Sequence, residues 1–573
     1  MTRALLALAL VGCVEHVQLS PGDGPLAGLT AIDLAPPQTT LAFTGLGAPP
    51  QALDLVATGH FSDGSERDVT AALTWTTDNA APGTFVAPGH YVASGAAGGH
   101  VSIHATDGAR DASATLTVTL TVSIVDGVYP PPGDPATLFP PDATVVTGDM
   151  AHAPAIEYPT DHTLLPPDLA PLTIQCDPGG SDAFRIAFDS DVLHVAVYTG
   201  TNRWHPDDAL WSAIARSSPD TDVALAITAT SSTATAPAPI YGSAAPTDLR
   251  FARANAGGAL TFFSDSTNGV MVAELSATTA AKLYPGPADG TCAGCHTLAR
   301  DGSVLAIGYG GTALETVDVA TGTTIVSASA AIPPGWSAFS PAGDRLVVAS
   351  NGALSLYDAH SGAHLGDIAT GMPATHPDWS PDGHYVAVAL AHMAMDMNMD
   401  GGAIARIPVT GDAFGAPEIL VPSSDNNDNN FFPRYSPDGH WLAYVHATSA
   451  SHAAATAELR LVPADGGTPI ALAVASHRAG ADPMPQAALA DTMPSWAPAI
   501  DGDTAWLAFA SARPYGVIRP MPMPSQIWIA GVDLAAAAAG SDPSFAAFWL
   551  PSQTPSAFAT NPIWTAGVQS IGR

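Results

Sequence analysis

The chain has 573 residues, of which 47% are hydrophobic and only 12% charged, and glycine (53) and proline (52) are both abundant. This composition favours short strands joined by many turns and disfavours helical bundles, whose surfaces need more charge. The formal net charge is −34, so the surface repels phosphate backbones and anionic lipids, which excludes nucleic acid as an expected partner. A chain of this length is expected to fold into several domains.

The N-terminus carries one positive charge, at Arg3, then an apolar run over residues 4–11 that leads into Gly12 and Cys13. This pattern resembles the signal peptide and lipobox of bacterial lipoproteins. In that family the cysteine, here Cys13, is lipidated and becomes the mature N-terminus. The resemblance predicts a signal peptide over residues 1–13 and an exported lipoprotein of the periplasm, outer membrane or cell surface. No later run reaches the roughly 20 apolar residues of a membrane helix, so membrane contact is expected only through the lipid anchor.

Residues 30–125 alternate apolar and polar positions between turn signals, which predicts a domain of short strands. The segments 61–70 (Phe-Ser-Asp-Gly-Ser-Glu-Arg-Asp-Val-Thr) and 73–79 (Leu-Thr-Trp-Thr-Thr-Asp-Asn) resemble bacterial Ig-like domains of group 2. Trp75 stands where a β-sandwich buries an aromatic side chain between its sheets. Such domains usually act as spacers or adhesion modules, and a stalk without a ligand is the preferred interpretation.

A proline-rich stretch over residues 126–171 comes next and predicts a stiff, extended linker. Residues 172–235 then predict a second small β-sandwich, in which no site is evident. Its strands are expected at 184–188, 192–198 and 223–228.

The strongest signal is a turn phrase, typified by Ser-Pro-Asp-Gly, that recurs ahead of alternating apolar strands. Proline presets the first turn angle, aspartate caps the turn, and glycine supplies the positive φ that lets the next strand start. The copies begin at Ala299, Ser340, Ser380, Ser436 and, more loosely, Ala497. The early copies are about forty residues apart, which is the length of a four-stranded propeller blade.

A second phrase, with proline in its second position and mostly an aromatic residue in its fourth, begins at His376, Phe432, Met493 and Asn561. No blade follows the last copy, so we expect it to be a terminal strand that closes the ring on the first blade and removes an exposed sheet edge. With a first blade near residues 249–280, residues 245–570 are expected to form six blades. The expected fold class is therefore all-β: Ig-like β-sandwiches followed by a six-bladed β-propeller.

The Ser-Pro-Asp-Gly pattern makes residues 245–570 similar to the TolB-like six-bladed propellers. In that group most members bind partner proteins, while related propellers gate peptidases or carry quinone cofactors. No Gly-x-Ser-x-Gly nucleophile elbow follows the propeller, which argues against a prolyl peptidase.

Cys292, Cys295 and His296 form a Cys-x-x-Cys-His motif. In c-type haem attachment the two thiols add to the vinyl groups and the imidazole ligates the iron. The motif resembles c-type cytochromes by these three residues only, because no helical cytochrome domain surrounds it. By residue type, the sixth iron ligand has three candidates: Met372, His376 and Met493. The alternative is a structural pair, either a Cys292–Cys295 disulfide or one of these cysteines bridged to Cys176.

Asp396, Asn398, Asp400 and Gly401 match the front half of a calcium loop, with oxygen ligands at alternate positions and glycine at the sharp turn. The closing glutamate is absent, because Ile407 occupies the twelfth position. The alternative is an ordinary polar hairpin tip.

Two functions are consistent with these patterns. The first is an envelope lipoprotein whose propeller, held on an Ig-like stalk, binds an envelope protein or a glycan. The second is a haem protein that acts in periplasmic electron transfer or redox sensing through Cys292, Cys295 and His296. No pair of carboxylates can be assigned as an acid–base couple, so no catalytic residue is predicted and an enzymatic role is the less favoured one.

Overall fold

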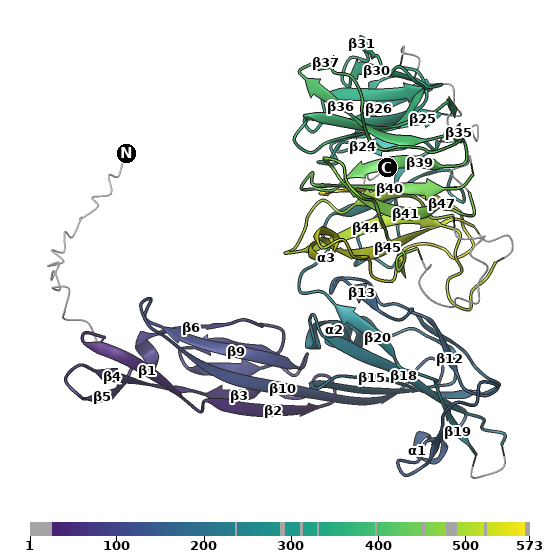
Figure 1. The fold of residues 1–573 in the computed structure, drawn as a ribbon. Coiled ribbons are helices and arrows are strands. Elements are labelled where there is room, and N and C mark those ends of the chain that lie inside the picture. The colour runs from purple at the N-terminus through teal and green to yellow at the C-terminus, as the bar shows by residue number, and fades with distance from the viewer. Residues whose placement is uncertain are drawn as a thin grey trace, which may run out of the picture. The chain divides into compact units, whose positions relative to one another are not determined.

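The computed structural model describes residues 26–234, 238–286, 293–309, 313–328, 332–395, 398–449, 454–476, 490–520 and 524–567. Strands dominate, and the helices are short (Figure 1). The chain divides into two compact units, residues 1–121 and 122–573. Within the described ranges, no helix is both long and apolar enough to cross a membrane.

The first unit is built from three small antiparallel groups of strands. One contains β1 (Leu29–Ala35), β4 (Val56–Phe61) and β5 (Glu66–Asp68), and another contains β3 (Gln51–Asp54), β8 (His90–Ala93) and β7 (Gly83–Ala87). The third contains β10 (Asp111–Val125), β9 (Gly99–Thr106) and β6 (Thr74–Thr77), with β2 (Gln38–Thr44) added in parallel to β10. Leu116, Val118 and Leu120 of β10 are buried at alternate positions, as a half-buried strand requires.

Trp75 lies on β6 and is half-buried. Its indole nitrogen donates a hydrogen bond to the carbonyl oxygen of Thr70 (2.9 Å), and its ring lies 5.3 Å from that of Phe85 on β7. The aromatic side chain therefore connects two of the sheets of this unit, although it keeps some exposure to solvent.

The second unit begins with a small domain centred on β15 (Ala183–Asp189). This strand pairs with β16 (Leu193–Thr199) on one side and β18 (Asp222–Thr230) on the other, and β18 also pairs with β19 (Ile240–Gly242) and β20 (Thr247–Phe251). Strands β15, β16 and β18 coincide with the three runs that the apolar alternation predicts.

Helix α2 (Asp208–Ser217) was not expected in this domain. The Asp207 side chain caps it by accepting a hydrogen bond from the Leu210 amide (2.8 Å). Trp211 on its buried face packs edge-on against Phe251 of β20 with 5.6 Å between ring centroids. The helix therefore covers the sheet where the sequence suggested a plain connection.

The proline-rich segment 126–171 also differs from expectation, because it is packed and not extended. It contains α1 (Pro135–Leu138), β11 (Val145–Val146), β12 (Ala155–Tyr158) and β13 (Thr163–Leu165). Strand β12 pairs with β14 (Ile174–Asp177), which pairs with β17 (Arg203–Trp204), and β13 runs parallel to β20. The apolar residues between the prolines explain the difference: Tyr158, Leu164 and Leu165 are all at most 3% exposed.

Six sheets, the blades, form the rest of the unit. The strands of each blade are given from the innermost strand outward. Blade 1 comprises β47 (Ala559–Thr565), β21 (Ala259–Ser264), β22 (Gly269–Ala273) and β23 (Ala281–Pro285). Blade 2 comprises β24 (His296–Leu298), β25 (Val304–Tyr309), β26 (Ala313–Asp318) and β27 (Thr323–Val326). Blade 3 comprises β28 (Trp336–Phe339), β29 (Arg345–Ser350), β30 (Ala353–Asp358) and β31 (His364–Ile368).

The remaining blades follow the same plan. Blade 4 comprises β32 (Ala374–Trp379), β33 (Tyr385–Leu390), β36 (Ala403–Thr410) and β38 (Glu418–Val421), with β37 (Ala413–Phe414) at its edge and the hairpin β34 (Met393–Met395) and β35 (Asn398–Asp400) inserted. Blade 5 comprises β39 (Asn429–Tyr435), β40 (Trp441–Ala447), β41 (Glu458–Pro463) and β42 (Ile470–Ala471). Blade 6 comprises β43 (Thr492–Trp496), β44 (Thr504–Ser511), β45 (Gln526–Asp533) and β46 (Phe548–Trp549), with helix α3 (Leu534–Ala538) after β45.

The ring closes as the repeated phrase predicts. The last strand, β47, pairs antiparallel with β21, so that Thr565 faces Ala259. The six inner strands contact one another in cyclic order, ending with β47 between β43 and β24. The blades can be followed in Figure 1 from teal β24 through green β39 to yellow β45. Closure therefore covers the inner edge of β21, which would otherwise be unpaired.

Candidate functional site: the funnel of the propeller

The inner strands of four blades share a bulge at the residue before a proline. His376, Phe432, Met493 and Asn561 have φ values of 51°, 50°, 53° and 54°. The pairing register of each of these blades shifts at the same place. Residues before proline avoid the right-handed helical region, and a β-bulge re-aims the side chains that follow it. The repeated proline phrase therefore sets how the inner strands of these four blades present their side chains to the central channel.

Three of the inner-strand side chains form an aromatic plug, defined here as Trp336, His376 and Phe432. The His376 ring lies 3.7 Å from Phe432 and 5.2 Å from Trp336, centroid to centroid, and Trp336 lies 5.0 Å from Phe432. Each of these residues is at most 7% exposed. Trp336 belongs to blade 3 and Phe432 to blade 5, so this contact joins two blades that are not neighbours in the ring.

A cavity of about 390 Å³, called the funnel below, lies further along the same strands and is lined by all six blades. Its inner ring takes one equivalent residue from each blade: Thr297, Ala338, Asp378, Arg434, Ser495 and Ile563. Its rim takes the residue that occupies the proline position of the turn phrase, or its counterpart in blade 1: Arg300, Pro341, Pro381, Pro437, Pro498 and Ala566. The two sequence repeats thus combine to build one concave site.

The inner ring contains one ion pair, between Arg434 of blade 5 and Asp378 of blade 4. The Arg434 Nη1 lies 3.3 Å from Asp378 Oδ1 and also donates to the carbonyl oxygen of Pro377 (3.2 Å). The second oxygen of Asp378 accepts a hydrogen bond from the Tyr435 amide (2.8 Å). Both charged side chains are mostly buried, at 13% and 16% exposed. The two charges of the pair are therefore compensated by each other and by backbone groups, and the pair places a polar group in the wall of the funnel.

Arg300 is the one charged residue at a rim position otherwise filled mainly by proline. Its Nη2 donates a hydrogen bond to the carbonyl oxygen of Trp379 (2.5 Å), which connects blade 2 with blade 4. Among the described residues, no carboxylate lies within ion-pair distance of this guanidinium, although the exposed Asp301 follows it in sequence. A guanidinium has five N–H donors, so Arg300 keeps donors for a ligand. Arg300 is not among the site residues predicted from the sequence, although its signal is visible there as an arginine at the position where most copies of the turn phrase carry proline.

Trp496 and Trp564 line the funnel, and Trp379 follows the inner-ring residue Asp378, but all three rings are almost fully buried. The indole nitrogens of Trp379, Trp496 and Trp564 donate to the carbonyl oxygens of Gly383, Arg434 and Gly257, respectively. The three residues are only 4–6% exposed. Their hydrogen bonds hold the wall of the funnel in place, and the rim residues that face a ligand are mainly prolines.

His296 of the Cys-x-x-Cys-His motif lies on β24 and is 3% exposed. Its Nδ1 is 3.1 Å from the carbonyl oxygen of Gly294, and its Nε2 is 3.4 Å from Thr261 Oγ1 on β21. The Asn561 side chain donates to the carbonyl oxygen of His296 (2.8 Å). Burial lowers the pKa of His296 to about 4, so the imidazole is neutral near pH 7. The residue acts as a connector between blades 1 and 2.

This setting does not suit a haem group. An iron ligated by His296 would need one ring nitrogen, and each nitrogen already faces a polar group of the packed seam. Cys295 is exposed, and Cys292 lies outside the described residues. Cys176 on β14 carries a free, buried thiol, and burial raises its pKa to about 12. The structural pairs that involve Cys292 fall outside the described residues and stay predictions. The attachment of haem remains a prediction of the motif alone.

The predicted calcium ligands lie in the hairpin inserted in blade 4. Asn398 and Asp400 belong to β35 and face Met395 and Met393 of β34, and Asp396 lies outside the described residues. Asn398 is exposed and Asp400 is half-buried. The two residues sit on an extended strand, whereas a calcium loop wraps its oxygens around the ion. Calcium binding also remains a prediction.

The six closed sheets define a six-bladed β-propeller protein. No protein-family model matches the chain, and no curated protein matches it either. Among solved structures the chain is similar to TolB from Acinetobacter baumannii, with 16% identity and a TM-score of 0.36 over 54% of this chain and 67% of that chain. It is also similar to a putative TolB from Agrobacterium tumefaciens (15% identity, TM-score 0.32, 54% of this chain and 98% of that one).

A third similar structure is that of a nidogen/laminin complex, with 13% identity and a TM-score of 0.36 over 54% of this chain and 98% of that chain. These likenesses concern the fold. The propeller itself is established by the pairing of the chain's own strands, and the properties of the site come from its residues.

Proposed function

We propose that this chain is a binding protein whose propeller receives a segment of a partner protein in the funnel. The observation that carries the proposal is a single cavity of about 390 Å³ to which every blade contributes. Its volume lies within the roughly 300–1,000 Å³ of ligand sites, and concave sites with a few fixed polar groups are the usual form of such sites.

The lining favours a polypeptide as the ligand. The prolines of the rim offer apolar contact, while Thr297, Ser495 and the Asp378–Arg434 pair offer polar groups deeper in the funnel. An extended peptide supplies both apolar side chains and backbone polar groups. The unused donors of Arg300 favour a carboxylate, either an acidic side chain or a chain terminus.

A glycan is the less favoured ligand. Sugar rings usually stack on exposed aromatic faces, and the three tryptophans around the funnel are buried with their N–H groups already bonded. The site therefore has few of the flat aromatic surfaces that carbohydrate recognition uses.

The proposed location is the cell envelope, with a lipid on Cys13. The support is the sequence pattern of residues 1–13 alone, and Cys13 lies outside the described residues. Labelled palmitate should be incorporated into the wild-type protein and not into a Cys13→Ala variant. Equal labelling of both would remove the anchor from the proposal.

The binding proposal is tested with a matched pair of substitutions in blade 3. Ala338 lines the funnel, whereas Ala353 is exposed on β30. The immobilised wild-type protein should capture a partner protein from an envelope extract. The Ala338→Phe variant should fail to capture this partner, and the Ala353→Phe variant should still capture it. Arg300→Gln, which introduces no bulk, serves as a second funnel variant if Ala338→Phe fails to fold. Retention of the same proteins by both funnel variants would overturn the proposal.

A further inference from the structure

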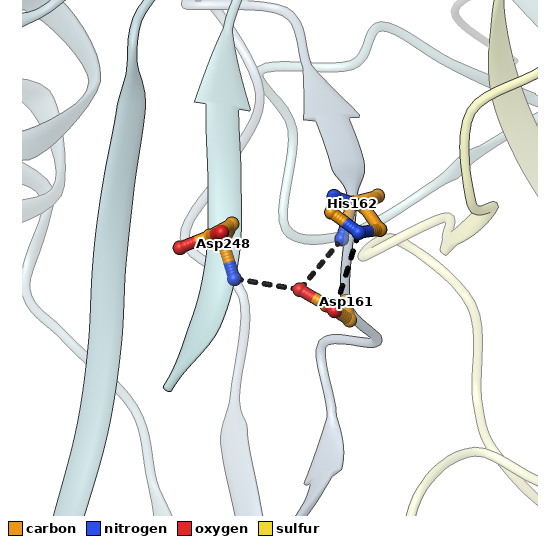
Figure 2. A group of neighbouring side chains, drawn as sticks. All are labelled: Asp161, His162 and Asp248. Carbon is orange, nitrogen blue, oxygen red and sulfur yellow. Dashed lines mark hydrogen bonds and ion pairs between the residues drawn. The ribbon is translucent and has the colours of Figure 1, made fainter. Parts of the chain in front are cut away.

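Asp161, His162 and Asp248 gather at one edge of the small domain, far from the funnel residues in sequence (Figure 2). Strands β13 and β20 run parallel, with Thr163 opposite Leu249. The residues just before the two strands therefore meet at the same sheet edge. One potential ligand atom from each side chain lies within 4.8 Å of the other two. Within the described parts of the chain, no other group of three His, Cys, Asp or Glu residues has this spacing.

The hydrogen bonds at this edge direct one oxygen of Asp161 toward the imidazole. Its Oδ1 accepts from the backbone amides of His162 (3.1 Å) and Asp248 (2.8 Å), as the dashed lines in Figure 2 show. Its Oδ2 is left facing His162 Nε2 at 3.4 Å. The Asp248 carboxylate accepts no hydrogen bond from the described residues, so it is also available.

Asp161 Oδ2 and His162 Nε2 are 3.4 Å apart. This separation is longer than a normal N–H···O hydrogen bond of about 2.7–3.2 Å. Zinc binds imidazole nitrogen and carboxylate oxygen at about 2.0–2.2 Å, and two such ligands of a tetrahedral ion lie about 3.3–3.5 Å apart. The spacing of these two atoms is thus compatible with two ligands of one zinc ion, and the Asp248 carboxylate, whose ligand atom lies within 4.8 Å of both, can turn to supply the third.

We propose that Asp161, His162 and Asp248 bind a Zn²⁺ ion, with a water molecule as the fourth ligand. One imidazole and two carboxylates suit zinc, whereas calcium takes six to eight oxygen ligands. His162 and Asp161 are 71% and 55% exposed, so an ion from solvent can reach them. This site is independent of the proposed partner binding.

The position of the site indicates what zinc would do there. The carbonyl oxygen of His162 accepts a hydrogen bond from the Ala546 amide (3.3 Å), and Thr163 forms an isolated β-bridge with Ala546. Ala546 precedes β46 of blade 6, so the turn that carries two of the ligands also connects the small domain to the propeller. An ion that binds only the folded state stabilises it by mass action. Zinc is therefore expected to raise the thermal midpoint of residues 122–573.

The test is zinc stoichiometry of the full chain, measured by equilibrium dialysis and metal analysis. Asp248→Asn preserves the side-chain shape, and His162→Asn suits the left-handed backbone at φ 59°. Each variant should bind one equivalent of zinc less than the wild type, or bind it at least tenfold more weakly. The control is His194→Asn, which removes an exposed histidine paired with Asp189 (3.1 Å) and should leave the stoichiometry unchanged.

Cobalt(II) substitution separates this site from zinc bound by cysteines. Ligation by nitrogen and oxygen gives visible d–d bands without the near-ultraviolet charge-transfer band of thiolates. The account predicts such a d–d spectrum in the wild type and in His194→Asn, and its loss in Asp248→Asn and His162→Asn. Equal zinc stoichiometry and equal cobalt spectra in all four proteins would overturn the proposal.

Discussion

The burial of His296 has a consequence for the pH dependence of stability. Burial lowers its pKa from 6.5 to about 4 in the folded state. Between these pH values the unfolded chain binds more protons than the folded one, so this residue makes the protein less stable as the pH falls from 6.5 toward 4. Above pH 6.5 its contribution is constant.

The prediction compares the wild type with His296→Gln by urea unfolding at pH 7 and pH 5. Between pH 7 and pH 5 the free energy of unfolding of the wild type should fall by about 2 kcal/mol more than that of the variant. The reason is that only the wild type contains a histidine whose pKa is lowered on folding. Other groups titrate in both proteins and cancel in the comparison. An equal loss in the two proteins would show that His296 is not held neutral in the folded state.

The same packing leads to a prediction about haem. Both ring nitrogens of His296 face groups within 3.4 Å in the seam between blades 1 and 2. We therefore expect no covalently attached haem. The protein, purified from a host that matures c-type cytochromes and then denatured, should show no Soret band. A covalent haem spectrum that disappears on Cys292→Ala would contradict this account and favour the redox function instead.

At the scale of elements, strand β47 is the critical one because it closes the ring. Asn561 combines two roles in it: a left-handed backbone at φ 54° and a side-chain hydrogen bond to the His296 carbonyl oxygen (2.8 Å). Replacing it by alanine removes the hydrogen bond and adds backbone strain, whereas glycine removes only the hydrogen bond.

Both Asn561 variants should therefore unfold at lower denaturant, each losing about 1–3 kcal/mol for the buried carbonyl group left without its partner. Asn561→Ala should be less stable than Asn561→Gly by about a further 1 kcal/mol, because alanine disfavours the left-handed region. If alanine were as stable as glycine at this position, the bulge of β47 would not require positive φ.

The repeated phrases predicted the elements that depend on local chemistry. The Ser-Pro-Asp-Gly turns mark where strands such as β33 and β40 begin, and the last proline phrase predicted the closing strand β47. Helix α2 was missed because ten residues with one capping aspartate give a weak periodic signal. The proline content of segment 126–171 predicts a linker, because local composition does not show that Tyr158 and Leu164 are buried in the fold.

The features that sequence could not predict depend on long-range register. The Trp336–Phe432 contact joins two blades that are not neighbours in the ring, and Arg300 reaches from blade 2 to blade 4. Asp161 and Asp248 meet only because β13 and β20 pair in parallel. Each of these contacts joins residues far apart in the chain, and no local pattern encodes the partner.

At the scale of the whole molecule, the small domain and the propeller belong to one compact unit. The Tyr158 hydroxyl, which is fully buried, accepts a hydrogen bond from the Trp549 amide (3.0 Å). The Gln175 side chain accepts another from the Val517 amide (3.1 Å), and Arg519 pairs with Glu157 (2.9 Å). These contacts make the small domain a support for blade 6.

Tyr158→Phe should therefore destabilise the unit by about 1–3 kcal/mol, because it leaves the buried Trp549 amide without an acceptor. Tyr435→Phe is the control, since the buried Tyr435 hydroxyl has no hydrogen-bond partner among the described residues and its removal should cost less. Chemical unfolding monitored by tryptophan fluorescence measures both. Equal effects would mean that the Tyr158 hydrogen bond does not stabilise the seam.

Site-specific photo-crosslinking in cells can show whether a partner protein enters the funnel. A photoreactive residue replaces Pro498 at the funnel rim or, as the control, Ala353 on the outside of blade 3. The account predicts a defined protein adduct from position 498, its loss when Ala338→Phe is added, and no such adduct from position 353. No protein adduct from the rim, or the same adduct from both positions, would contradict the account.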